Sequence, residues 1–450
     1  MQRLGHPFES IWAKALIIGG LTLLMLWPLA RVGSLVSERQ ELQHQAYGVI
    51  SAGFGGSQTI GGPIISVDTQ DLVVDPSGNN PIEAWRPGAP IHLLSEKLRI
   101  ESDIAVEVRR KGIYSVPVYV SKFVVTGQFT ADSIAHVLAS NADMRASPSH
   151  AVIQLPLPGV RYLRGLTLFA VNGQPLHVTS EEIAGFAALS ALIDLQSLDR
   201  TIPLTFRIEF ELAGSDSIHF LPLASDTTVT ARIAWQHPDF DGAFLPISHE
   251  SSASGYSASW HVLELNRAIP QTWRGATVSN SALLATSFGV RMFQPSDIYT
   301  QNYRAMRYGI LFIAITFACF FACEHVIRGL RLHPMQYLLI GLALATFYLL
   351  LLALSEHVGF AIAYTIAAAA LVALITTYIV GATSNRRAAG WIGAALATAY
   401  AVLYVILLSE DYALLFGSLL LFGILSALML ATRRLDWATL GRQDSRSDNA

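Results

Sequence analysis

Long apolar stretches occupy the two ends of the chain. A helix that crosses a bilayer needs about 20 consecutive, mostly apolar residues. Six stretches reach that length, at residues 12–30, 305–323, 335–354, 358–380, 389–408 and 411–431. Nine charged residues lie between positions 305 and 431; eight fall at the predicted turns, and Arg307 lies at the start of the second stretch. Because none falls in the middle of a stretch, the pattern predicts six membrane-spanning helices.

Alternation of apolar and polar residues replaces continuous apolarity in residues 31–304, between the first and second predicted spans. From Leu98 to Val108 the even positions are apolar with one exception, while most odd positions are charged. The same period of two runs through residues 201–212 and 228–235. A period of two with one apolar face is typical of half-buried antiparallel strands.

Turns rich in Gly, Pro and Asn separate these long strands, as in DPSGNNP at 75–81 and VNGQP at 171–175. Such a pattern favours a large mainly-β domain that is β-sandwich-like. Two segments, 131–140 and 180–195, carry apolar residues at helical spacing instead, and Ser180 can cap the second. We therefore predict a mainly-β domain that two short helices interrupt.

Basic residues indicate which side of the membrane each loop occupies, because cytoplasmic loops are enriched in Lys and Arg. The basic residues of the short loops, and of the chain directly after the last span, are Arg328, Arg331, Arg386, Arg387, Arg433 and Arg434. The loops at 355–360 and 409–411 contain neither Lys nor Arg. Both termini are therefore expected in the cytoplasm, and residues 31–304 are expected to be exported.

This topology divides the chain into five parts. They are a cytoplasmic N-terminus (1–11), a transmembrane helix (12–30), an exported mainly-β domain (31–304), a five-helix transmembrane domain (305–431) and a cytoplasmic C-terminal tail (432–450). A removable signal peptide is the competing interpretation of residues 1–30. Their apolar run is longer than the usual core of about 7–15 residues, and no A-x-A site follows directly, so an uncleaved anchor is favoured. Cleavage would leave the mainly-β domain on the same side.

Composition agrees with a membrane protein and narrows the possible partners. Hydrophobic residues make up 52% of the chain and charged residues 14%, and the mean hydropathy is +0.42. These values exclude intrinsic disorder. The formal net charge of −3 gives no indication of nucleic-acid binding. The two cysteines, Cys319 and Cys323, are too few and too close together for a disulfide framework. They lie within a predicted span, where helix packing is the favoured role.

Polar residues at the ends of the predicted spans are the candidate functional residues. They are Arg331, His333, Gln336, Tyr337, Glu356 and His357. Because His titrates near neutral pH, one hypothesis is a pH-responsive contact between the pair at 356–357 and the exported domain. The acidic pairs at 324–325, 356–357 and 410–411 also raise the hypothesis of a proton relay. Since all three pairs lie at the membrane interfaces, where water solvates them, simple polar turns between helices are the favoured interpretation.

Motifs of hydrolases and nucleotide-binding proteins are missing from the sequence, including G-x-S-x-G, H-E-x-x-H and G-x-x-x-x-G-K-[ST]. His237, His249 and His261 are evenly spaced, but zinc ligands usually come in close pairs, and none of the three has such a neighbour. We therefore predict no catalytic, cofactor-binding or metal-binding residues and expect a protein that is not an enzyme and needs no cofactor.

The block RLHPMQYLLIGLALATFYLLLLALSEHVGF, residues 331–360, closely resembles the CreD family of inner-membrane, cell-envelope integrity proteins of Gram-negative bacteria. Further matching stretches are GGPIISV (61–67), RRKGIYS (109–115), WQHPDFDGAFLP (235–246) with Gly255 and Trp260, and YALLFGS (412–418). The resemblance implies an inner-membrane protein linked to envelope integrity, induction under a two-component system that senses carbon source or β-lactam stress, and an association with colicin tolerance. It brings no catalytic residues.

Three functional hypotheses follow. The leading one is a non-enzymatic envelope-stress protein whose periplasmic domain binds a protein partner or envelope material, with membrane lipids around its spans. The alternative is a transporter or flippase for an envelope lipid or precursor, although the spans lack the mid-membrane charges and prolines that transporters use. The third is an enzyme without a recognisable motif. The oligomeric state stays open.

Overall fold

A computed structural model describes residues 11–75, 82–139, 144–195, 201–292, 298–326, 332–383 and 386–408, together with eight single positions between 415 and 429. The chain divides into two compact units. One, called here the helical unit, comprises Met1–His44 and Ser296–Ala450. The other, called the β-rich unit, comprises Gln45–Pro295. Each unit is described separately below.

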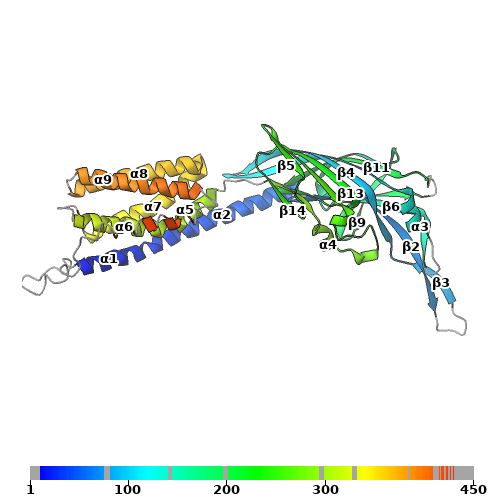
Figure 1. The fold of residues 1–450 in the computed structure, drawn as a ribbon, viewed down its shortest axis with the longest axis horizontal. Coiled ribbons are helices and arrows are strands. Elements are labelled where there is room, and N and C mark those ends of the chain that lie inside the picture. The colour runs from blue at the N-terminus through cyan, green and yellow to red at the C-terminus, as the bar shows by residue number, and fades with distance from the viewer. Residues whose placement is uncertain are drawn as a thin grey trace, which may run out of the picture. The chain divides into compact units, whose positions relative to one another are not determined.

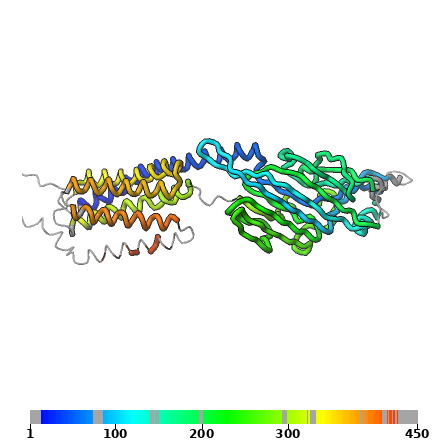
Figure 2. The backbone as a smooth tube through the Cα atoms, turned by 90° about the horizontal axis from the view of Figure 1, so that it is seen from above, coloured from blue at the N-terminus to red at the C-terminus, as the bar shows by residue number. Residues whose placement is uncertain are grey.

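Helices that run side by side build the helical unit (Figures 1 and 2). Their bounds are α1 Ile11–Leu24, α2 Leu26–Phe54, α5 Ile298–Arg307, α6 Gly309–Val326, α7 Pro334–Val358, α8 Phe360–Thr383 and α9 Arg386–Leu408. Helix α7 packs against α1, α5, α6 and α8, and α8 packs against α9. Apolar and aromatic side chains fill the interior, among them Phe317, Leu344, Phe347 and Tyr400. Most of the buried residues of α7 belong to this interior.

Several of these helices are long and apolar enough to cross a membrane. In the described part of the chain they are Ala13–Phe54, Pro334–Val358, Phe360–Ala382 and Ala389–Leu408. Helices α5 and α6 form a further pair that is bent by 41° and qualifies as one broken span. The structure therefore gives four or five spans where the sequence predicts six. The remaining predicted span, 411–431, lies outside the described residues apart from single positions.

Helix α2 continues well beyond the predicted first span, which ends at residue 30. Residues 31–50 are rich in Leu, Glu, Gln and Arg, which favour helix. The helix ends where Gly55 and Gly56 adopt φ values of +116° and +59°. Their amide groups donate to the carbonyl of Ser51, at 2.6 and 3.0 Å, and so satisfy the last turn. The β-rich unit begins at Gln45, inside this helix.

The β-rich unit is built on two sheets. Its strands are β1 Gln58–Ile60, β2 Ile64–Asp75, β3 Ile82–Pro87, β4 Ile91–Lys111, β5 Tyr114–Phe129, β6 Met144–Pro156, β7 Leu163–Val171, β8 Gln174–Pro175, β9 Val178–Ile183, β10 Phe186–Asp194, β11 Leu204–Ser215, β12 Ser217–Phe220, β13 Ala224–Ile233, β14 Pro238–Gly242, β15 Ser248–Ser252, β16 Gly255–Leu263, β17 Thr272–Arg274 and β18 Phe288–Met292. The large sheet has 14 strands, with the path β8-β7-β11-β5-β4-β2-β6-β10-β9. The small one has the order β1-β12-β18-β14.

Strand β4 holds the large sheet together. It pairs along most of its length with β5, which follows it through a turn at Gly112 with φ +63°. Its first residues also pair with β2 and β17, and residues 95–104 pair in parallel with β13. Aromatic side chains from both sheets share one core, as Phe220 and Phe288 of the small sheet do with Trp260 of β16. The mainly-β prediction is confirmed.

The strands expected at 98–108, 201–212 and 228–235 are confirmed over most of their length, as the residues that they share with β4, β11 and β13. The apolar face of β4 is buried, with Leu98, Ile100 and Ile104 at most 2% exposed. The helix expected at 131–140 is present as α3, Ala131–Leu138, and the Thr130 hydroxyl caps its first turn.

The helix expected at 180–195 is wrong. These residues form the hairpin of β9 and β10, in which Phe186 pairs with Ile183. Ala184 and Gly185 make the two-residue turn with φ values of +51° and +80°. Two consecutive residues with positive φ are the signature of the hairpin turn that matches strand twist. The side chains buried in the core then recur at every second position, as Leu189, Ala191 and Ile193 show. Pairing with neighbouring strands therefore outweighs the local helical spacing.

Candidate functional site

Two of the predicted residues, His333 and Gln336, cap the start of α7. His333 is the N-cap residue, and its Nδ1 accepts a hydrogen bond of 3.3 Å from the Met335 amide. Gln336 Oε1 accepts in return from the His333 amide, at 2.8 Å. Pro334 occupies the first turn, where its missing N–H costs nothing. His333 and Gln336 therefore stabilise the start of α7. The third predicted residue of this segment, Arg331, lies outside the described residues.

Tyr337 lies one turn further along α7 in a cluster that the sequence did not reveal. Its side chain is fully buried against the rings of Phe317 and Phe320. The Lys14 ammonium lies 5.9 Å from the centre of the Tyr337 ring and 2.6 Å from a Glu324 carboxylate oxygen. Glu324 is only 5% exposed and also accepts from the Leu332 amide. Lys14, Glu324 and Tyr337 form what we call the Lys14 cluster, which joins α1, α6 and α7.

Glu356 belongs to a second cluster near the other end of α7. Its Oε1 accepts from the Tyr299 hydroxyl at 3.2 Å and lies 3.7 Å from Arg39 Nε. The neighbouring Ser355 hydroxyl accepts from the buried Asn302 amide group at 2.8 Å. These five residues form the Glu356 cluster, which joins α2, α5 and α7. The adjacent His357 is exposed at the helix end and is not part of the cluster.

The two clusters mark the ends of the apolar stretch of α7. Tyr337 and Glu356 are nineteen residues apart on this continuous helix, which corresponds to about 28 Å. That length is close to the ~30 Å hydrocarbon thickness of a bilayer. The acidic groups at 324 and 356 are therefore bound by basic partners from the N-terminal helices, rather than solvated in polar turns as the sequence suggested.

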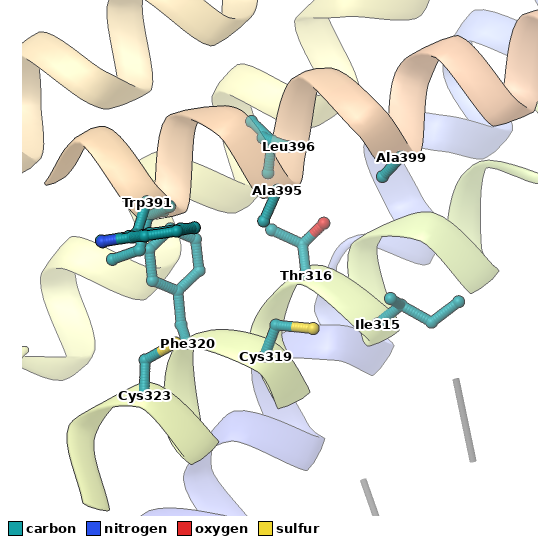
Figure 3. Close-up of a pocket in the computed structure, with 10 residues that line it drawn as sticks. Ile315, Thr316, Cys319, Phe320, Cys323, Trp391, Ala395, Leu396 and Ala399 are labelled. Carbon is teal, nitrogen blue, oxygen red and sulfur yellow. The ribbon is translucent and has the colours of Figure 1, made fainter. Parts of the chain in front are cut away.

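A groove with a volume of about 320 Å³ lies between α6 and α9. Figure 3 shows Cys319, Phe320 and Cys323 of α6 facing Trp391 and Leu396 of α9 across it. The Thr316 hydroxyl in its lining donates to the Phe312 carbonyl of its own helix. The lining is otherwise apolar and suits hydrocarbon more than a polar ligand.

The β-rich unit contains a larger and more polar cleft, with a volume of about 720 Å³. Strands β2, β4, β6 and β9 form one part of its wall, and residues 275–280 form the other. Its polar lining residues are Ser66, Asp68, His92, Gln154, Glu181, Glu182, Ser279 and Asn280. Clefts of about 300–1,000 Å³ with a few converging polar groups are the usual form of small-molecule sites. None of these residues was a candidate from sequence, although Ser66 lies in the stretch GGPIISV that carries the family resemblance.

A hydrogen-bonded chain runs along the wall of this cleft. The Ser66 hydroxyl lies 2.8 Å from His92 Nδ1 and donates to Gln154 Oε1, also at 2.8 Å. Gln154, 6% exposed, donates through Nε2 to a Glu181 carboxylate oxygen at 3.4 Å and to the Ser190 hydroxyl at 3.3 Å. The His92 ring packs on Trp273, with 5.2 Å between ring centres. Burial lowers the pKa of His92 from its usual 6.5, so the ring is neutral at pH 7.

His92 should make the stability of the β-rich unit depend on pH. Because its pKa is lower in the folded state, the unfolded chain binds more protons below pH 6.5. The contribution of His92 to the free energy of unfolding should therefore be fully present above that pH. It should be lost as acid is added, by at most about 1.4 kcal/mol per pH unit for one proton. Hydrogen exchange of β2, β4 and β6 in the full chain measures this, and His92→Gln should flatten the profile. Ser248→Ala, at an exposed and non-titrating side chain of β15 outside the cleft lining, is the control and should leave the slope unchanged.

Comparison with known proteins places the chain in a family. The family model described as inner membrane protein CreD matches residues 10–438. The chain belongs to the CreD family. It is also similar to the protein named inner membrane protein CreD of Escherichia coli strain K12, with 30% identity over 436 residues, covering 95% of this chain and 94% of that relative. Together with the apolar helices, membership supports a protein that crosses the inner membrane several times.

Proposed function

We propose that this CreD-family chain is a non-enzymatic membrane protein that supports envelope integrity by binding a ligand in the cleft of its β-rich unit. The helical unit anchors the protein, with both termini in the cytoplasm and the β-rich unit in the periplasm. The role belongs to the response to envelope and β-lactam stress and extends to colicin tolerance. The cleft between β2, β4, β6, β9 and residues 275–280 is the single observation that carries the proposal.

The chemistry of the cleft supports binding rather than catalysis. The Ser66 hydroxyl donates to the Gln154 carbonyl oxygen, so its proton is not directed at His92. A serine nucleophile needs the opposite arrangement, in which a neighbouring base accepts the hydroxyl proton. The network instead fixes side chains on the wall, as binding sites require.

Transport is supported less well. In the described part of the helical unit, Glu324 and Glu356 are each bound to a basic partner near an end of α7. The side chains buried between these ends are mostly aromatic and aliphatic, as with Phe347, Tyr364 and Tyr400. Transporters place charged groups or broken helices near the membrane centre. Helices α7 and α8 are each continuous, and the bent pair α5 and α6 is the one feature of the described spans that would suit transport.

Blocking the cleft tests the proposal. Ala276 is exposed and lines the cleft, so Ala276→Trp fills part of it without removing a side-chain hydrogen bond. In a strain that lacks the gene, wild-type protein should restore growth in the presence of detergent or a β-lactam. The Ala276→Trp variant should reduce plating efficiency to near that of the empty vector.

Ala105→Trp is the matched control, because Ala105 is exposed on β4 away from the cleft lining. It should restore growth fully. Full rescue by Ala276→Trp, at a protein level equal to that of the wild type, would contradict the proposal.

A further inference from the structure

We propose that the cleft of the β-rich unit binds an organic cation that carries a primary ammonium group. This inference rests on the proposed function and names the ligand class for the same site. Three features of the lining support it: the direction of the hydrogen bonds along the wall, the carboxylates, and the absence of Lys and Arg among the lining residues that the structure describes.

The direction of each hydrogen bond along the wall follows from Glu181. A carboxylate only accepts, so the Gln154 group that faces Glu181 must be its NH₂. Gln154 Oε1 then faces the Ser66 hydroxyl, which must use its one proton to donate to it. The Ser66 oxygen can therefore only accept at its 2.8 Å contact with His92 Nδ1, so Nδ1 carries the ring proton. His92 Nε2 is left as a hydrogen-bond acceptor.

Acidic side chains add negative charge to these acceptors. Asp68 of β2 and the neighbouring Glu181 and Glu182 of β9 line the cleft and are exposed to solvent. None of the lining residues that the structure describes is Lys or Arg. A ligand that enters the cleft therefore meets three carboxylates without a basic side chain to neutralise them, and a cation is favoured.

The lining thus offers acceptors from several directions, and a primary ammonium group has three donors and no acceptor. The volume of about 720 Å³ is sufficient for a diamine or for a lysine side chain with its neighbours. A small polyamine and a lysine-bearing peptide present the same group, so the two sources need separate measurements.

Binding to the purified full chain in detergent micelles tests the inference. The probes are cadaverine for a small diamine, trilysine for a peptide, and the diol analogue of cadaverine as a neutral control of the same length. Isothermal titration at low ionic strength should show binding of at least one amine and none of the diol. Glu181→Gln combined with Glu182→Gln should weaken amine binding by roughly tenfold or more.

Two further variants separate a site from general attraction. Glu101→Gln combined with Glu107→Gln makes the same change of charge on exposed positions of β4 outside the cleft and should have little effect. Ser279→Asp adds a carboxylate to the cleft lining while keeping a residue type that caps the short helix α4, Asn280–Leu284. It should strengthen amine binding severalfold.

The outcomes are distinct. Binding of cadaverine alone indicates a small amine, and binding of trilysine alone indicates a peptide; both support the inference. Failure of both amines to bind, equal binding of the diol, or an equal loss in the two double variants overturns it. If both amines fail while Ala276→Trp still abolishes rescue of growth, the proposed function stands and only the ligand class is wrong.

Discussion

Replacing Trp260 with alanine is expected to remove much of the stability of the β-rich unit. Trp260 is fully buried, and its ring centre lies 5.7–6.1 Å from those of Phe220, Phe240 and Phe288. Its deletion leaves a cavity where the small sheet meets β16, and such substitutions cost about 3–5 kcal/mol. Domains have only about 5–15 kcal/mol in total. Hydrogen exchange of the β13 and β16 amides in the full chain measures the loss.

Two controls identify the cause of that loss. Trp85 of β3 is 36% exposed, so Trp85→Ala should cost much less. Trp260→Phe keeps an aromatic ring and removes an indole N–H that has no hydrogen-bond partner among the described residues. It should therefore cost only about 1–2 kcal/mol. Equal exchange rates in Trp260→Ala and wild-type protein would contradict the importance of this cluster.

Strands and spans could be predicted where one local pattern determines the structure. Along β4 the period of two matches the geometry of a strand, and burial of Ile100 and Ile104 follows directly. The parallel pairing of β13 with β4 has no such local signal, because the two strands are far apart in the sequence. The 180–195 segment was ambiguous for a related reason. Its apolar residues fit both periods, and the turn at Ala184 depends on a positive φ that alanine rarely adopts.

The cleft could not be predicted because it collects residues from five separate segments. Ser66, His92 and Gln154 come from three different strands, and their pairing brings them together. Glu181 and Glu182 lie inside the segment expected to be helical. In a helix their side chains would point in other directions than they do in strand β9. The residues at the helix ends could be predicted better than those of the cleft, since Glu356 and Tyr337 do lie in clusters with charged partners. Their partners Arg39 and Lys14 come from the other end of the chain and carry no local sign of the pairing.

Removing the charge of Glu324 is the second change with a large expected effect. Its carboxylate is 5% exposed and its partner Lys14 is 20% exposed, so Glu324→Gln leaves a largely buried ammonium without its counter-charge. Breaking a buried ion pair in this way costs about 3–5 kcal/mol, and the partial exposure of Lys14 brings the expected loss to about 2–4 kcal/mol. The thermal midpoint of the purified protein in micelles should fall accordingly, while Glu38→Gln, on an exposed position of α2, should not change it.

The double variant distinguishes an ion pair from two independent contacts. Lys14→Met combined with Glu324→Leu removes both charges and replaces them with apolar side chains of similar size. Because two buried charges are expensive to desolvate, such a replacement is often close to neutral. The double variant should thus be more stable than Glu324→Gln alone, and the coupling energy from the full cycle should be at least about 1 kcal/mol. Additive losses would show that Lys14 does not stabilise the bundle through Glu324, and that α1 is held by apolar packing against α6 and α7 instead.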